Sequence, residues 1–185
     1  KKDTTPPAMF QSAFLEQASN FPSYSHIYTD GSKSEERVGC AAVAGRSFDT
    51  IIKERLPDHS SIYTAELKGL LLSLTVCGES GGDTFLVISD SLSALQGISS
   101  LKLTHPLLAD FHDAHSELRE KGIDILFMWC PSHVGVRGNA AADAAAKESL
   151  QHPEPDTQLY HYVPYTDLKS LVNKYVFKLW QQDWS

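Results

Sequence analysis

The chain has 185 residues and a mass of 20.4 kDa, with 42% hydrophobic and 21% charged residues. These values are typical of a globular domain and exclude a wholly disordered chain. The net charge of −7 by itself argues against a nucleic-acid partner, since phosphate binding usually needs a basic surface. No segment approaches the ~20 consecutive apolar residues of a membrane helix, and the first residues lack the apolar core of a signal peptide. We therefore expect no membrane partner.

Cysteine usage indicates the redox environment. The chain contains Cys40, Cys77 and Cys130, an odd number without a Cys-x-x-Cys pair. This pattern argues against a disulfide framework and against a structural zinc site. We therefore expect an intracellular protein, in the nucleus or the cytoplasm.

The first part of the chain predicts an arm, three strands and a helix. Three segments rich in β-branched and aromatic residues are separated by short links, which is typical of an antiparallel meander. A helical spacing of leucines follows them. In chain order, these elements are the N-terminal arm 1–23 with a short helix at 10–18, the strands 24–30, 38–44 and 48–56, and the helix 62–77.

The second part alternates strands and helices. Its predicted elements are the strand 85–89, a helix starting at Ser91, the helix 107–121, the strand 123–129 and the alanine-rich helix 139–150. Prolines then lead into a linker and a last helix, 167–182, capped by Thr166, within residues 151–185. The whole order predicts an α/β domain over residues 24–150, with a mixed five-stranded sheet and helices on its faces.

Four carboxylates stand at positions that suggest one site. Asp30 ends the first predicted strand and Asp90 ends the fourth, so both meet at one sheet edge if these strands are parallel neighbours. Taken alone, each also fits a turn or a helix cap. Glu66 shares a helix face with Leu70 and Leu74, where an unpaired carboxylate is costly, and Asp143 lies among alanines. Such a cluster calls for cations.

Oxygen-rich sites of this kind suit Mg²⁺ or Mn²⁺. Two such ions can stabilise both the attacking and the leaving oxygen in phosphodiester cleavage. They also answer the objection from net charge, because the ions supply positive charge where the phosphate binds.

Sequence blocks around these carboxylates resemble the ribonuclease H (RNase H) family, most closely the RNase H domain of non-LTR retrotransposon polyproteins. The blocks are Tyr28-Thr29-Asp30-Gly31-Ser32, Thr64-Ala65-Glu66-Leu67, Ser89-Asp90-Ser91 and Trp129-Cys130-Pro131-Ser132-His133, followed by Gly138-Asn139 and Asp143. Each block alone is a weak signal. Together, in the family's order and over residues 24–150, they are specific.

The resemblance implies a sheet of order 3-2-1-4-5 and a nuclease that cleaves the RNA strand of RNA–DNA hybrids during reverse transcription. It assigns two Mg²⁺ ions, replaceable by Mn²⁺, to Asp30, Glu66, Asp90 and Asp143. The loop residue His133 is implied to assist proton transfer or product release, beside Gly135 and Gly138, which would leave the loop mobile. Substrate contacts are expected at Gly31, Ser32, Ser61, Ser91 and Asn139. Expected partners are the hybrid and neighbouring polyprotein domains with a reverse transcriptase.

Some features leave alternatives open. The segment 101–121 lacks the basic helix-loop insertion that serves some family members as a substrate-binding element. Lys33, Arg37 and Arg137 are either phosphate contacts or solvated charges. Trp180 and Trp184 are expected to dock on the domain or on a neighbouring domain. A His112–His115 zinc pair and a Cys130–His133 nucleophile are both disfavoured, because further ligands or an orienting partner are missing.

Two rival functions remain. One is a domain of the same fold that binds hybrid or protein without cutting. The other is a DNA nuclease of resolvase or integrase type. The presence of all four acids favours an active RNase H over the first rival.

Overall fold

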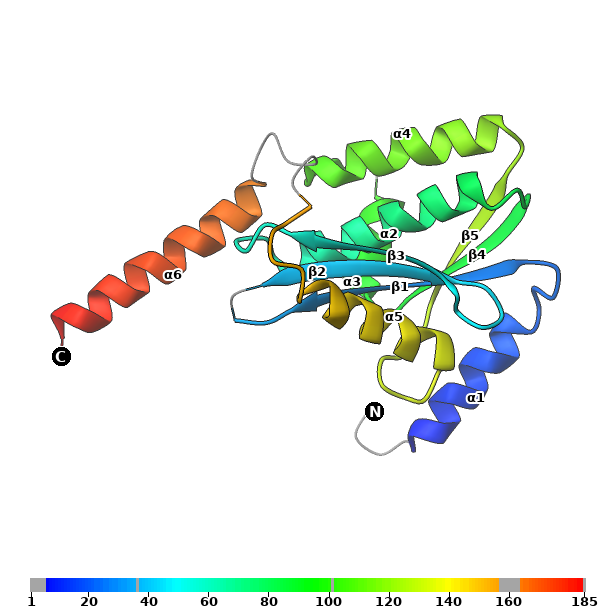
Figure 1. Ribbon diagram of the computed structural model, residues 1–185, viewed down its shortest axis with the longest axis horizontal. Coiled ribbons are helices and arrows are strands. Elements are labelled where there is room, and N and C mark those ends of the chain that lie inside the picture. The colour runs from blue at the N-terminus through cyan, green and yellow to red at the C-terminus, as the bar shows by residue number, and fades with distance from the viewer. Residues whose placement is uncertain (1–5, 36, 101, 157–163, 185) are drawn as a thin grey trace.

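The computed structural model describes residues 6–35, 37–100, 102–156 and 164–184. A five-stranded sheet in the order β3-β2-β1-β4-β5 forms its centre (Figure 1). The strands are β1 (Ser25–Lys33), β2 (Val38–Ala44), β3 (Thr50–Leu56), β4 (Thr84–Ser89) and β5 (Asp124–Trp129). The helices are α1 (Pro7–Ala18), α2 (Ile62–Glu79), α3 (Leu92–Ser99), α4 (Pro106–Glu120), α5 (Arg137–Ser149) and α6 (Tyr165–Asp183).

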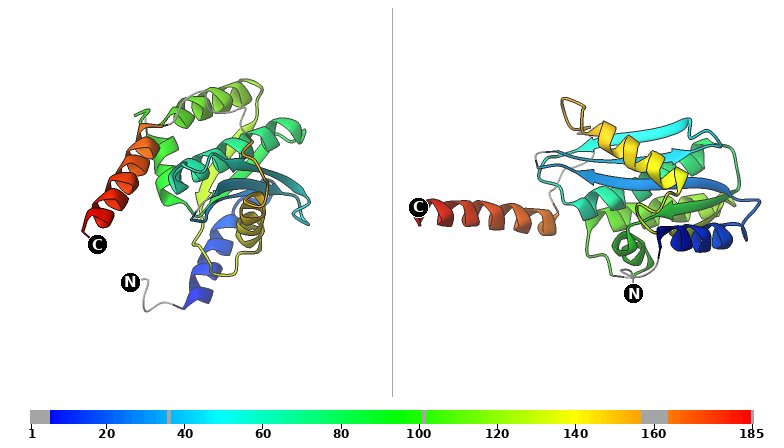
Figure 2. Two further views of the ribbon diagram at one scale, coloured as in Figure 1. Left: turned by 60° about the vertical axis from the view of Figure 1, so that its left-hand side comes forward. Right: turned by 90° about the horizontal axis from the view of Figure 1, so that it is seen from below.

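The predicted fold class is confirmed. Strands β1, β2 and β3 pair antiparallel, while β4 pairs parallel with both β1 and β5. Helices cover both faces of the sheet, as Figure 2 shows from two further sides. Among the described residues, no helix has the length and apolarity needed to cross a membrane.

Strand β1 runs three residues beyond the predicted end at Asp30. Residues 31–33 remain extended because they pair with 38–40 of β2, the other arm of the same hairpin. Strand β3 starts later than predicted, at Thr50. Phe48 has a φ of +56°, a left-handed conformation that a strand does not accommodate.

Each face of the sheet has its own apolar core. On one face, side chains of α2, α3 and α4 pack against Ile27, Val87 and Ile125. On the other face, α1 and α5 pack against Tyr28 and Leu86. The sheet is therefore buried on both sides, as expected for strands with continuous apolar runs.

The predicted N-terminal arm contains α1, which packs into the second core. Phe14 is 3% exposed, and Ala18 is also buried. The Gln11 side-chain amide donates a hydrogen bond of 2.8 Å to the Gly135 carbonyl in the loop between β5 and α5. Residues 7–18 thus share a core with the sheet and hold this loop from outside.

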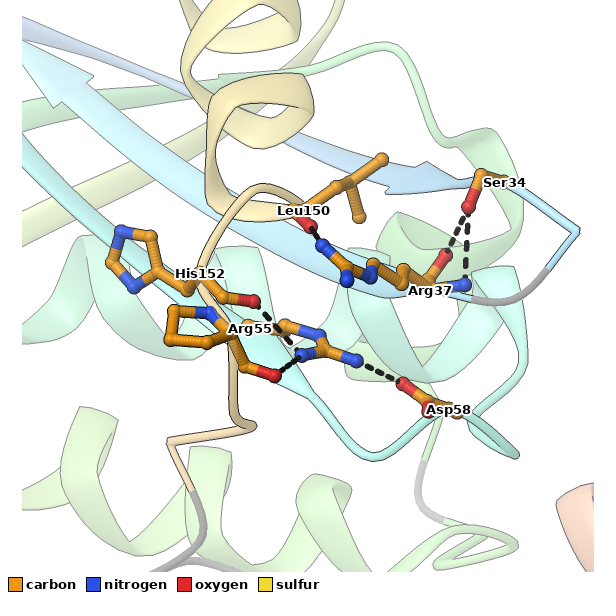
Figure 3. A network of polar contacts seen from close by, with 7 residues as sticks. Ser34, Arg37, Arg55, Asp58, Leu150 and His152 are labelled. Carbon is orange, nitrogen blue, oxygen red and sulfur yellow. Dashed lines mark hydrogen bonds and ion pairs between the residues drawn. The ribbon is translucent and has the colours of Figure 1, made fainter.

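Two arginines attach the chain after α5 to the edge of the sheet (Figure 3). The Arg37 guanidinium donates to the Leu150 carbonyl at 2.8 Å. Arg55, 4% exposed, donates to the carbonyls of His152 and Pro153 and forms an ion pair of 2.6 Å with Asp58. These contacts fix the exit of α5 against β2 and β3.

Helix α6 begins at Tyr165, after Pro164 rather than after a Thr166 cap, and projects away from the sheet (Figure 1). Asp167 is fully buried, whereas the other described side chains of α6 are exposed. Trp180 and Trp184 are 59% and 80% exposed and contact each other. The expected docking of these tryptophans on the domain is therefore wrong.

Glycine at position 31 permits the close approach of β1 and α2. A Cβ atom built on Gly31 would lie 2.9 Å from the backbone nitrogen of Glu66 and 3.0 Å from the Cβ of Ala65. Since backbone atoms cannot rotate away as a flexible side chain does, any larger residue must move the first turn of α2.

We predict that Gly31→Ala lowers the free energy of unfolding by roughly 1–3 kcal/mol, because overpacking forces backbone shifts. Urea unfolding measures this change. Gly78→Ala is the matched control, because its Cβ would meet only Leu118 Cδ2 at 3.4 Å, an ordinary contact. Equal stability of Gly31→Ala and the parent protein would contradict the close-packing argument.

Candidate active site

The register of two parallel strands brings Asp30 and Asp90 together. The last parallel pair between β1 and β4 joins Thr29 to Ser89, and the two aspartates follow directly. Beyond this pair β4 ends, while β1 continues only along β2. Both carboxylates therefore lie where the sheet opens between two neighbouring strands, at the carboxyl ends where α/β proteins place ligands.

Glu66 reaches the same point from the second turn of α2. Ser61 caps this helix by accepting a hydrogen bond from the Thr64 backbone N–H at 3.1 Å. One carboxylate oxygen from each of Asp30, Glu66 and Asp90 lies within 4.8 Å of the others. Within the described part of the chain, Glu66 Oε2 is buried without a hydrogen-bond partner.

The electrostatic cost of this arrangement appears in the pKa values. Burial raises the pKa of Asp30 to about 8, and the nearby carboxylates of Asp90 and Asp143 add to the rise. Burial raises the pKa of Glu66 to about 9, again with contributions from Asp30 and Asp90. Like charges at short distance in a poorly solvated place disfavour ionisation, so a cation is needed to keep all of them ionised.

Asp143 lies beside this triad but is held differently. Its Oδ2 accepts a hydrogen bond of 2.7 Å from the Lys147 ammonium, four residues later on α5. The Asp143 carboxylate still contributes to the raised pKa of Asp30, and Lys147 opposes that rise. The structure thus places carboxylate oxygens of three of the four predicted acids within 4.8 Å of one another. The fourth acid, Asp143, lies beside them and is partly neutralised by Lys147.

Asn139, predicted as a substrate contact, positions Asp90. Its buried side-chain amide donates to Asp90 Oδ2 at 3.1 Å, and its Oδ1 accepts from Cys130 Sγ at 3.3 Å. Burial, with nearby carboxylates adding, raises the pKa of the Cys130 thiol to about 12. Burial, the hydrogen bond to Asn139 and the raised pKa all disfavour a Cys130 nucleophile, since the thiolate is the reactive form.

His133 is exposed in the loop between β5 and α5 and has a φ of +58°. A left-handed backbone is uncommon outside glycine and marks a constrained loop position. This loop is more constrained in conformation than its two glycines predict. Gly138 belongs to α5, where a Cβ would lie 2.2 Å from the Tyr28 ring, and the Gly135 carbonyl is bound by Gln11.

The other predicted substrate contacts lie around the triad. Gly31 and Ser32 follow Asp30 on β1. Ser61 and Ser91 are the N-caps of α2 and α3, so their hydroxyls accept backbone hydrogen bonds at these helix starts. Both serine hydroxyls thus already have hydrogen-bond partners within the protein, at the starts of α2 and α3.

The predicted phosphate contacts also have structural partners. Arg37 donates to the Leu150 carbonyl, and Lys33 donates to the Ser60 carbonyl. The Arg137 guanidinium lies over the Phe48 ring, 5.8 Å from its centroid. Arg37 is engaged in holding the chain, whereas Lys33 retains further N–H donors for an incoming anion.

The sequence did not predict one buried polar cluster next to the site. Thr64 Oγ1 donates to Asp167 Oδ2 at 2.7 Å and lies 3.0 Å from His105 Nε2. His105 and Asp167 are separated by 41 and 103 positions from Thr64, and the three residues belong to α2, the start of α4 and α6. The sequence signal was present only as an acidic residue in the first turn of a predicted helix.

The family model described as RNase H matches residues 22–151. The chain belongs to the RNase H family. No curated protein sequence matches it.

Several solved structures share the RNase H fold of this chain. The N-terminal RNase H domain of rv2228c from Mycobacterium tuberculosis, solved fused to maltose-binding protein, is 22% identical with a TM-score of 0.55, covering 69% of this chain and 93% of its own. RNase H1 of the archaeon Halobacterium salinarum NRC-1 is 22% identical with a TM-score of 0.52, covering 69% and 97%. LC11-RNase H1, isolated from compost, is 17% identical with a TM-score of 0.52, covering 69% and 98%.

The residues at this RNase H site fit a divalent cation. The donors are carboxylate oxygens, which suit hard cations such as Mg²⁺ and Mn²⁺. The buried, unpartnered Glu66 Oε2 and the raised pKa of Asp30 are both relieved by a positive ion between the carboxylates. Asp30, Glu66 and Asp90 are the residues that would hold it.

We predict that the metal-free protein loses stability as the pH rises. In the unfolded chain Asp30 and Glu66 titrate near pH 4, whereas in the folded chain their pKa values are about 8 and about 9. The folded state therefore binds more protons between these values, so the free energy of unfolding falls with pH, by at most about 1.4 kcal/mol per unit for each proton.

Urea unfolding in EDTA at about pH 6 and about pH 8.5 measures this effect. Asp30→Asn should flatten the dependence, and Mg²⁺ should stabilise the protein more at the higher pH because its binding displaces the protons. A pH dependence that is the same in Asp30→Asn and in the parent would contradict the assignment.

Proposed function

We propose that this chain is a divalent-metal-dependent endonuclease that hydrolyses the RNA strand of RNA–DNA hybrids. The observation that carries the proposal is the convergence of Asp30, Glu66 and Asp90 within 4.8 Å at the open edge between β1 and β4. Membership of the RNase H family supports the choice of an RNA–DNA hybrid as substrate.

Two bound Mg²⁺ ions would activate the attacking water and stabilise the departing oxygen, leaving 3′-hydroxyl and 5′-phosphate ends. The protein's part is to position these ions and the substrate. Asp30 and Asp90 supply carboxylates fixed by strand register, and Asn139 orients Asp90 through its amide. Asp143 supplies a further carboxylate on the side of Lys147.

Recognition of RNA is proposed to involve a contact of Glu66 with a 2′-hydroxyl, the group that DNA lacks. His133, exposed at the loop, is proposed to move a proton to the departing 3′ oxygen or to assist product release. Gly31 and Ser32, next to Asp30, are the residues nearest in sequence for backbone contacts to the cleaved strand.

The biological setting is proposed from the sequence blocks. Their likeness to non-LTR retrotransposon polyproteins supports RNA removal during reverse transcription, beside a reverse transcriptase domain. The three buried free cysteines support an intracellular setting in the nucleus or the cytoplasm.

The deciding experiment incubates the protein with labelled RNA–DNA hybrid, double-stranded RNA and duplex DNA, with and without Mg²⁺. We expect Mg²⁺-dependent cleavage of the RNA strand of the hybrid alone. Cleavage of duplex DNA would instead support a DNA nuclease on the same fold. Binding of hybrid without any cleavage would support the non-cutting alternative.

We predict that Asp30→Asn and Asp90→Asn each abolish cleavage, because each removes a charge from the metal site while keeping the size of the side chain. Neither variant should unfold, since like-charge repulsion falls. Cleavage assays and thermal melts measure both effects. Asp113→Asn, on the exposed side of α4, is the matched control and should retain full activity.

We predict that His133→Ala slows turnover without abolishing it, because the metal site supplies the nucleophile. A proton-transfer role would reduce single-turnover cleavage by roughly 10²–10⁴-fold. A release role would lower the steady-state rate and leave single-turnover cleavage nearly unchanged. If both rates equal those of the parent protein, His133 has no part in the reaction.

A further inference from the structure

An acidic chain that binds a polyanion needs positive charge near its active site. Four of its described cations form ion pairs within the protein. The ion pairs are Lys53–Glu148 at 2.8 Å, Arg55–Asp58 at 2.6 Å, Lys68–Glu54 at 3.3 Å and Lys147–Asp143 at 2.7 Å. These side chains are neutralised locally and contribute little to attracting a phosphate backbone.

Helix α6 starts beside the active site. Asp167, in its first turn, is fully buried and accepts the hydrogen bond from Thr64, which stands two residues before Glu66 on α2. Helix α6 then extends outward from the end of the sheet at which β1 finishes (Figure 1). The buried carboxylate thereby anchors the first turn of α6 to the first turn of α2.

The same face of α6 carries lysines. Lys174 and Lys178 stand seven and eleven positions after Asp167, a spacing that places all three on one side of a helix. Both lysines are exposed, and no ion pair is found for either among the residues that the structure describes. Their own spacing of four residues is about 6 Å along the axis.

Lys33 joins this face to the active site. It stands three residues after Asp30, at the end of β1. The Lys33 ammonium donates to the Ser60 carbonyl just before α2, and Thr64 in the first turn of α2 donates to Asp167 of α6. Burial, and next the Lys174 ammonium, lower the pKa of Lys33, in agreement with this placement. Positive charge thus continues from the end of β1 along one side of α6.

We propose that Lys174 and Lys178 of α6, continuous with Lys33, bind the phosphate backbone of the nucleic-acid substrate outside the active site. This inference rests on the proposed function for the identity of the substrate. Charge complementarity selects nucleic acid as the occupant, because Lys174 and Lys178 form no ion pair among the described residues and lie on the helix that Asp167 anchors two residues from Glu66. Lysines act here as sequence-independent contacts that hold the duplex.

The test measures hybrid binding by fluorescence anisotropy in the Asp30→Asn background, so that the substrate stays intact. We expect K174Q/K178Q to raise the Kd roughly tenfold at about 50 mM salt. The slope of log Kd against log salt should fall by about 2, one for each phosphate that a lysine no longer neutralises. In the otherwise unaltered chain, the same pair should raise KM and leave kcat at saturating hybrid unchanged.

The matched control is R119Q/K121Q, which removes two exposed positive charges at the C-terminal end of α4, away from its N-cap His105. It should leave the Kd and the salt slope near those of the parent. Equal weakening by both pairs would show a general charge effect and overturn the proposal. An unchanged Kd in K174Q/K178Q, with its thermal melt unaltered, would also overturn it.

The competing explanation is that a second copy of this chain binds the apolar side of α6. The exposed residues of this side include Val172 and Leu179. A dimer in sedimentation velocity that dissociates in V172E/L179E, together with a Kd insensitive to the lysine pair, would overturn the proposal. Failure of the parent to cleave hybrid would refute the proposed function alone, because the binding measurements do not depend on cleavage.

Discussion

The parallel pairing of Thr29 with Ser89 is the constraint on which the site depends. It sets Asp30 and Asp90 side by side, and the close contact of Gly31 with α2 adds Glu66. Three carboxylates then share a poorly solvated edge, and burial with mutual repulsion raises the pKa values of Asp30 and Glu66. The favourable free energy of folding therefore offsets the cost of clustering these carboxylates, and the cluster is formed before any cation binds.

The two apolar cores provide that energy and also the rigidity. The sheet is packed on one side by α2, α3 and α4 and on the other by α1 and α5. Because packed interiors respond to changes of a single methylene, strand register and helix position are held within narrow limits. Because β1 and α2 are held in place, the metal-free protein relieves burial and mutual repulsion by protonating Asp30 and Glu66 rather than by moving its backbone.

Hydrophobic periodicity and strand ends are local signals, so the sequence predicted the strands, the helices and the meeting of Asp30 with Asp90, whereas the order of the strands came from the resemblance to RNase H. The sequence did not predict that β1 continues past Asp30, since that extension depends on pairing across the hairpin with β2. It left Arg37 open as a phosphate contact, whereas the guanidinium holds the Leu150 carbonyl. It also missed the cluster of Thr64, His105 and Asp167.

These misses have one physical origin. Arg37 and Leu150 are 113 positions apart, and Thr64 and Asp167 are 103 apart. A polar side chain with such a distant partner looks identical in sequence to one that faces water. The hydroxyl of Thr64 and the carboxylate of Asp167 are recognisable as partners only once α6 has been placed against α2.

The negative net charge and the binding of a polyanion are compatible because charge acts over short distances. At physiological ionic strength, interactions between exposed charges decay over about 8 Å. Under the proposed function, a phosphate at the carboxylate edge would therefore respond to the cations held there and to the closest side chains, and not to the total charge of the chain. Placement of few positive charges beside the site, rather than the total of −7, decides whether substrate is attracted or repelled.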